Sequence, residues 1–145
     1  MGFKANLKGA VLAGIMTAFG AGAAVAQSCE ETQFTSKTGE VYLQAEQAAM
    51  VKKDFGEAAK KMNELRTMPL NCYEEGAVLK LSAYINIENG NSQGAINDLM
   101  AALNKGYIPA KDSAQTYYNI AQIYLQSENV NKALEFMQKW QQAGG

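Results

Sequence analysis

The chain has 145 residues, of which 48% are apolar and 19% charged, and its net charge is −1. This length suits one domain, with or without a processed leader segment. Because the chain has no basic block, it lacks the massed lysine and arginine that bulk binding to nucleic acid requires. Histidine is absent, which removes the usual general base near neutral pH and the commonest zinc ligand.

The first 26 residues have the pattern of a secretory signal peptide. Lys4 and Lys8 precede an uncharged apolar run over residues 9–23, and Ala24-Val25-Ala26 forms an A-x-A cleavage site. A retained membrane anchor and a lipoprotein are the alternatives. Glycines weaken the run as a membrane helix, and residues 26–28 lack a lipoprotein cleavage box. We therefore predict export and cleavage after Ala26, which leaves a net charge of about −3.

Export changes the interpretation of the two cysteines, Cys29 and Cys72. An even number of cysteines in an oxidising compartment favours a disulfide. Closing the loop of 43 residues between them would stabilise the fold by roughly 4 kcal/mol. A pair of redox-active thiols is the alternative, although such pairs usually have the C-x-x-C spacing that this sequence lacks.

The chain that follows the leader repeats itself three times. Residues 54–58, 91–95 and 129–133 align at spacings of 37 and 38 residues, the range of helical-hairpin arrays. Each segment begins with Asp or Asn, which can cap a helix, and ends with an alanine that opens an apolar stripe of helical period. The pattern predicts an all-α fold of six helices, at 39–52, 55–67, 73–88, 92–104, 110–127 and 130–142.

Residues 27–38 are expected to form an N-terminal tail before the helical domain at 39–145. In an antiparallel pair of the first two helices, the start of the first lies beside the end of the second. Cys29 precedes that start and Cys72 follows that end. A bridge between them would therefore hold the tail over the first hairpin.

The third unit resembles a tetratricopeptide repeat (TPR). That family carries an aromatic residue, an apolar–small pair and a second aromatic in its first helix, then alanine and a bulky apolar residue in its second. The third unit has these as Tyr117, Ile120-Ala121, Tyr124, Ala133 and Met137. The second unit matches through Leu79, Ala83, Ala95 and Leu99, with Asn86 where tyrosine is common.

The first unit diverges most from the TPR pattern. Glu46 occupies the small-residue place in the simplest alignment, and the alanines at 45, 48 and 49 would let the helix rotate to compensate. The resemblance implies a right-handed superhelical stack of three TPR-like hairpins. A narrower similarity links residues 103–109, 118–125 and 135–140 to small exported TPR proteins that accompany TonB–ExbB–ExbD energy-transducing systems in diderm bacteria. It implies a periplasmic accessory whose membrane contact is only indirect.

Stacked helix pairs present the first helix of each pair on a concave face. We expect the partner-binding residues on that face to be Leu43, Gln47, Lys80, Tyr84, Ile87, Tyr118 and Gln122. Tyrosines are good contact residues, although Tyr84 and Tyr118 also suit packing between helices, and a lone lysine is often only solvated. Tyr84 stands where TPR domains that grip a terminal carboxylate place Asn, which disfavours that ligand.

No nucleophile elbow, phosphate loop or metal-ligand cluster stands out in the sequence. We expect a non-enzymatic exported scaffold that binds a partner protein or peptide, with no cofactor, metal, nucleic acid or small-molecule substrate. The alternative is a self-assembling structural subunit, such as a homodimer. It is suggested by Trp140 in the last helix, because no further capping helix follows this residue.

Overall fold

The computed structural model describes residues 29–145, so the predicted signal peptide at 1–26 lies outside the described residues. In this part of the chain the regular elements are all helical, which confirms the predicted all-α fold. They are α1 (Ser36–Glu46), the π-helical segment η1 (Gln47–Val51), α2 (Phe55–Arg66), α3 (Cys72–Glu88), α4 (Ser92–Asn104), α5 (Ala110–Gln126) and α6 (Val130–Gln142).

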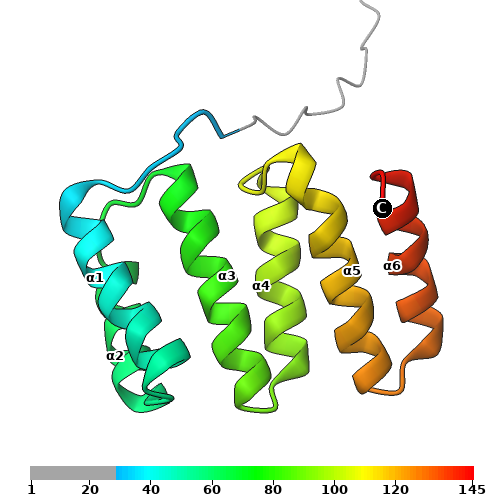
Figure 1. The fold of residues 1–145 in the computed structure, drawn as a ribbon, viewed down its shortest axis with the longest axis horizontal. Coiled ribbons are helices and arrows are strands. Elements are labelled where there is room, and N and C mark those ends of the chain that lie inside the picture. The colour runs from blue at the N-terminus through cyan, green and yellow to red at the C-terminus, as the bar shows by residue number, and fades with distance from the viewer. Residues whose placement is uncertain (1–28) are drawn as a thin grey trace, which may run out of the picture.

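The helices form three hairpins that lie side by side in a row (Figure 1). Helix α1 packs on α2, α3 on α4, and α5 on α6, and neighbouring hairpins meet through α2 with α3 and α4 with α5. One cluster of buried apolar side chains joins the first hairpin to α3, and a second joins α3, α4, α5 and α6. Helix α3 therefore contributes to both cores, through Val78, Leu81 and Ile85 to the first and through Ala83 to the second.

The turns within the hairpins share one geometry. Asp54, Asn91 and Asn129 each cap the following helix by accepting a hydrogen bond from the backbone three residues on, at 2.9, 3.0 and 3.2 Å. The residue before each cap has a left-handed φ: Lys53 (55°), Gly90 (74°) and Glu128 (59°). Only Gly90 adopts this conformation without steric cost from a side chain.

An alanine stands four positions after each cap and is buried. Ala58, Ala95 and Ala133 are 0%, 0% and 1% exposed. The burial of all three confirms that the repeat marks the interior of the structure. A larger side chain at these positions would force the helices apart or leave them strained.

The first hairpin contains one residue more than the other two. Asp54 follows Ala45 by nine positions, whereas Asn91 follows Ala83 by eight. The π-helical turn of η1 absorbs this extra residue, and Ala45, Ala48 and Ala49 are all buried. The buried small side chain of this helix is thus Ala45, one position before Glu46.

The chain ahead of α1 runs across one end of the hairpins (Figure 1). Helix α1 begins at Ser36, three residues earlier than expected, so the described tail, residues 29–35, is shorter; we call it the strap. The strap passes the start of α3, and the backbone N–H of Cys29 donates to the carbonyl of Gly106 in the α4–α5 loop, at 3.3 Å. The strap was expected to lie over the first hairpin alone. This hydrogen bond shows that it also reaches the second hairpin.

The carboxylate of Glu74 anchors the strap to α3. Its side chain is fully buried and accepts hydrogen bonds from the backbone N–H of Thr35 at 2.7 Å, the backbone N–H of Asn71 at 2.9 Å and the hydroxyl of Thr38. Burial by itself raises the pKa of Glu74, but the hydrogen bonds from Thr38, Asn71 and Thr35 outweigh it and hold the pKa below its ordinary value. The folded structure therefore stabilises the ionised form of Glu74.

Replacing Glu74 by Gln should destabilise the protein by about 1–3 kcal/mol at neutral pH, because an amide presents one acceptor oxygen and no charge. Since the pKa of Glu74 is lower in the folded than in the unfolded chain, its contribution is present above the unfolded pKa and is lost as the pH falls through the folded pKa. Urea unfolding of wild type and Glu74→Gln should thus give a free-energy difference that shrinks on acidification.

The control for this prediction is Glu75→Gln, which alters the neighbouring carboxylate in an exposed ion pair with Lys105 at 3.4 Å. That change should cost little at any pH. Equal losses for the two variants would contradict a special role of Glu74.

Candidate functional site

A pocket of about 340 Å³ opens between α3 and α5 and reaches down to α4. Its apolar surface comes from Ala83, Tyr84 and Ile87 of α3, Leu99 of α4 and Ile123 of α5. Its polar lining consists of Lys80, Thr116, Asn119, Gln122 and Gln126. An apolar hollow with a few polar groups around it is the usual composition of a binding site.

The structure brings together four of the seven residues predicted to bind a partner. Lys80, Tyr84, Ile87 and Gln122 all line the pocket. The spacing of the first three along α3 places them on one face of the helix, since residues three or four apart are neighbours there.

The other three predicted residues lie outside the pocket lining. Leu43 and Gln47 are exposed on the first hairpin. Tyr118 packs instead on Trp140, with ring centroids 5.6 Å apart, so both rings are half-buried within the third hairpin.

Tyr84 is held at the pocket by Lys53, which lies in the turn between η1 and α2. The ammonium group of Lys53 donates a hydrogen bond to the Tyr84 hydroxyl, lies 5.0 Å from the centre of its ring and 3.8 Å from the Glu88 carboxylate. The hydrogen bond to Tyr84 raises the pKa of Lys53, so the lysine stays charged. This contact connects Tyr84, which lines the pocket, to the turn of the first hairpin.

Sequence reasoning did not assign the other pocket residues to the binding face: Ala83, Leu99, Thr116, Asn119, Ile123 and Gln126. Leu99 was assigned only to packing and Ile123 was given no role, yet both border the pocket. Asn119 and Gln126 are separated by seven residues, which places them on one face of α5 with Gln122. The spacing of these three amide side chains in the sequence could have predicted the polar rim of the pocket.

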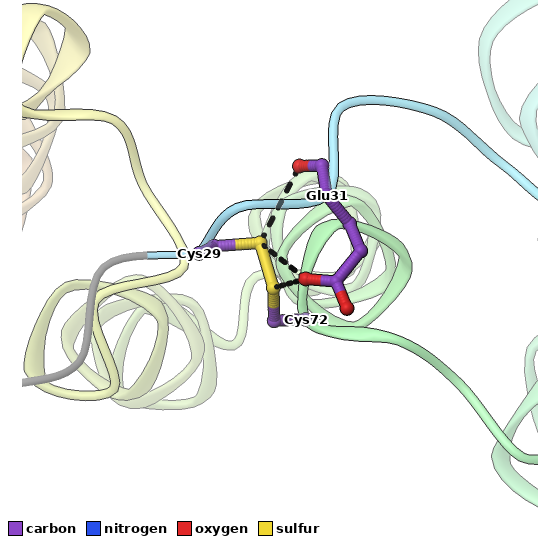
Figure 2. A group of neighbouring side chains, drawn as sticks. All are labelled: Cys29, Glu31 and Cys72. Carbon is purple, nitrogen blue, oxygen red and sulfur yellow. Dashed lines mark hydrogen bonds between the residues drawn. A yellow bond between two sulfur atoms is a disulfide. The ribbon is translucent and has the colours of Figure 1, made fainter.

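A second group of side chains with ligand chemistry gathers where the strap meets α3 (Figure 2). The sulfur atoms of Cys29 and Cys72 and a carboxylate oxygen of Glu31 lie within 4.8 Å of one another. The two sulfurs are joined in a disulfide with 5.6 Å between the Cα atoms, as the sequence predicted, and Glu31 Oε2 lies 2.7 Å from Cys72 Sγ. Sulfurs bound to each other offer no thiolate to a metal, so this group serves as a covalent clasp.

The disulfide fits a protein exported to an oxidising compartment. Within residues 29–145, none of the helices combines the length and apolarity needed to cross a membrane. A scan against protein-family models, a search of curated proteins and a search of solved structures each found no match to this chain.

Reducing the disulfide should lower the free energy of unfolding by roughly 4 kcal/mol, because the loop of 43 residues is no longer closed in the unfolded chain. We expect the helical circular dichroism signal to persist while the denaturation midpoint falls. The control is the double variant Cys29→Ser/Cys72→Ser, whose stability should not respond to reductant. Alkylation of two thiols in folded, never-reduced protein would contradict the bridge.

Proposed function

We propose that this chain is an exported, non-enzymatic scaffold that binds a segment of a partner protein in the pocket between α3 and α5. The observation that carries the proposal is the pocket itself, because its apolar surface is drawn from three helices of two neighbouring hairpins and its rim is polar. Such a site exists only when the hairpins are stacked. Binding of the partner would then depend on the stacking of the second and third hairpins.

The resemblance to TPR proteins supports the finer parts of this proposal. Three hairpins of similar length, each with its cap and buried alanine, suit a right-handed superhelical TPR-like stack with a concave face formed by α1, α3 and α5. The signal-peptide pattern and the disulfide support a periplasmic location. The narrower similarity favours a component of a TonB-type system as the partner.

The test of the binding face compares two substitutions at equivalent places in the second and third hairpins. Ile87 lines the pocket and is 40% exposed, whereas Leu125, 38 positions later, is 45% exposed outside it. Ile87→Glu should weaken partner capture tenfold or more, on the scale of losing one buried apolar side chain. Leu125→Glu should leave capture unchanged.

Quantitative mass spectrometry of proteins captured from an envelope extract provides the measurement, with circular dichroism to verify that both variants fold. A captured protein lost with Ile87→Glu and retained with Leu125→Glu supports the site. If every captured protein responds equally to the two substitutions, the pocket is not the binding face.

The second candidate function, self-assembly, is favoured by one specific observation on α6. Leu134 and Ile96 both directly follow the repeated alanine, yet Ile96 is 4% exposed under α5 while Leu134 is 58% exposed. No described helix covers this face of α6, where a further hairpin would pack in a longer array. A second copy of the chain is the simplest structural subunit to cover it.

Light scattering coupled to size exclusion tests this alternative. Self-assembly through α6 predicts a wild-type dimer that Leu134→Glu converts to a monomer. Leu43→Glu, a control at another exposed leucine on the first hairpin, should remain dimeric. A wild-type monomer at high micromolar concentration would exclude the alternative and leave a different protein as the partner.

A further inference from the structure

The charge of the pocket between α3 and α5 restricts what can occupy it. Lys80 is the one charged residue in the described lining of this pocket, and its side chain is exposed. None of the ion pairs formed within residues 29–145 involves Lys80. The nearby charge of Lys53 is matched by Glu88, at 3.8 Å. An occupant therefore meets one unmatched positive charge at the rim.

The apolar part of the pocket lies one to two turns farther along α3. Ala83, Tyr84 and Ile87 follow Lys80 by three, four and seven residues, so they lie about 5–10 Å from it along the helix axis. Leu99 and Ile123 complete this surface from the neighbouring helices. An apolar side chain inserted here would leave water and gain contacts on three sides.

The opposite rim offers groups for a polypeptide backbone. Asn119, Gln122 and Gln126 follow one face of α5, and each side-chain amide has both donors and an acceptor. The side-chain carbonyl of Asn119 accepts a hydrogen bond from Gln115 at 2.9 Å, so its NH₂ group is the part of this amide that can donate to a ligand. Alternating donors and acceptors are what an extended main chain presents, so the amide row suits a peptide segment better than an isolated ion.

We propose that the pocket recognises an acidic and apolar segment of a partner protein, in which a side-chain carboxylate pairs with Lys80 and an apolar side chain fills the hollow beside Tyr84 and Ile87. This inference rests on the proposed function and adds the chemistry of the partner to it. Because an extended chain advances about 3.3 Å per residue, the acidic and apolar residues are separated by two or three positions.

The test is a selection from a library of random 12-residue peptides on immobilised protein in its disulfide-bonded form. Four proteins are compared: wild type, Lys80→Glu, Ile87→Glu and Lys60→Glu. Lys60 is a control lysine on α2 whose side chain is 78% exposed and which pairs only with Glu57, at 3.9 Å. Fluorescence anisotropy then measures the affinity of the enriched peptides for each protein at low and high salt.

We expect wild type and Lys60→Glu to enrich Asp or Glu two or three positions from a large apolar residue. Lys80→Glu should reverse the charge preference to Lys or Arg and bind the wild-type peptides at least threefold more weakly, with the difference reduced by salt. Ile87→Glu should bind none of them. This pattern would establish both the site and its ligand chemistry.

The other outcomes separate the two levels of the proposal. Enriched peptides that require Ile87 but show no acidic preference, and that bind Lys80→Glu normally, would overturn the acidic partner and leave the pocket as a binding site. Peptides that bind Ile87→Glu as well as wild type, or the absence of any enrichment, would overturn the proposed function and this inference together.

Discussion

A buried alanine at the same place in each hairpin is the constraint on which the rest of the structure depends. Ala58, Ala95 and Ala133 have almost no exposed surface, and each follows its helix cap at the same distance. Because the three hairpins are built alike, they can pack in a row with α2 against α3 and α4 against α5. The pocket between α3 and α5 depends on this packing, since Leu99 of α4 contributes to its apolar lining.

Most of the fold could be predicted from local sequence patterns. Caps, stripes of period 3.6 and the repeat located the helices from α2 onward to within about one residue, because these signals depend on residues close in sequence. The first helix was harder to place. Its start is held by Glu74, 39 residues after Thr35, and its end by a π-helical turn that an extra residue requires. Neither a hydrogen bond between residues far apart in sequence nor an inserted residue can be recognised from hydrophobic periodicity.

Only part of the candidate site could be predicted from the same local patterns. The exposed stripe of α3 gave Lys80, Tyr84 and Ile87 because one helix face is a local property. The contact of Tyr118 with Trp140 could not be predicted, since it depends on how α5 and α6 pack, which the stripe alone does not determine. Leu99 was not predicted as a site residue because its place on an apolar stripe indicated packing. In the structure it belongs to the core and also borders the pocket.

The disulfide has a mechanical consequence. Residues 29–72 form a covalently closed loop that contains the whole first hairpin. If tension were applied between the two ends of residues 29–145, the load would pass from Cys29 through the sulfur bridge directly into α3. Helices α1 and α2 would carry none of that force through their backbone. The second and third hairpins, which have no such covalent bypass, would carry the whole load through their backbone.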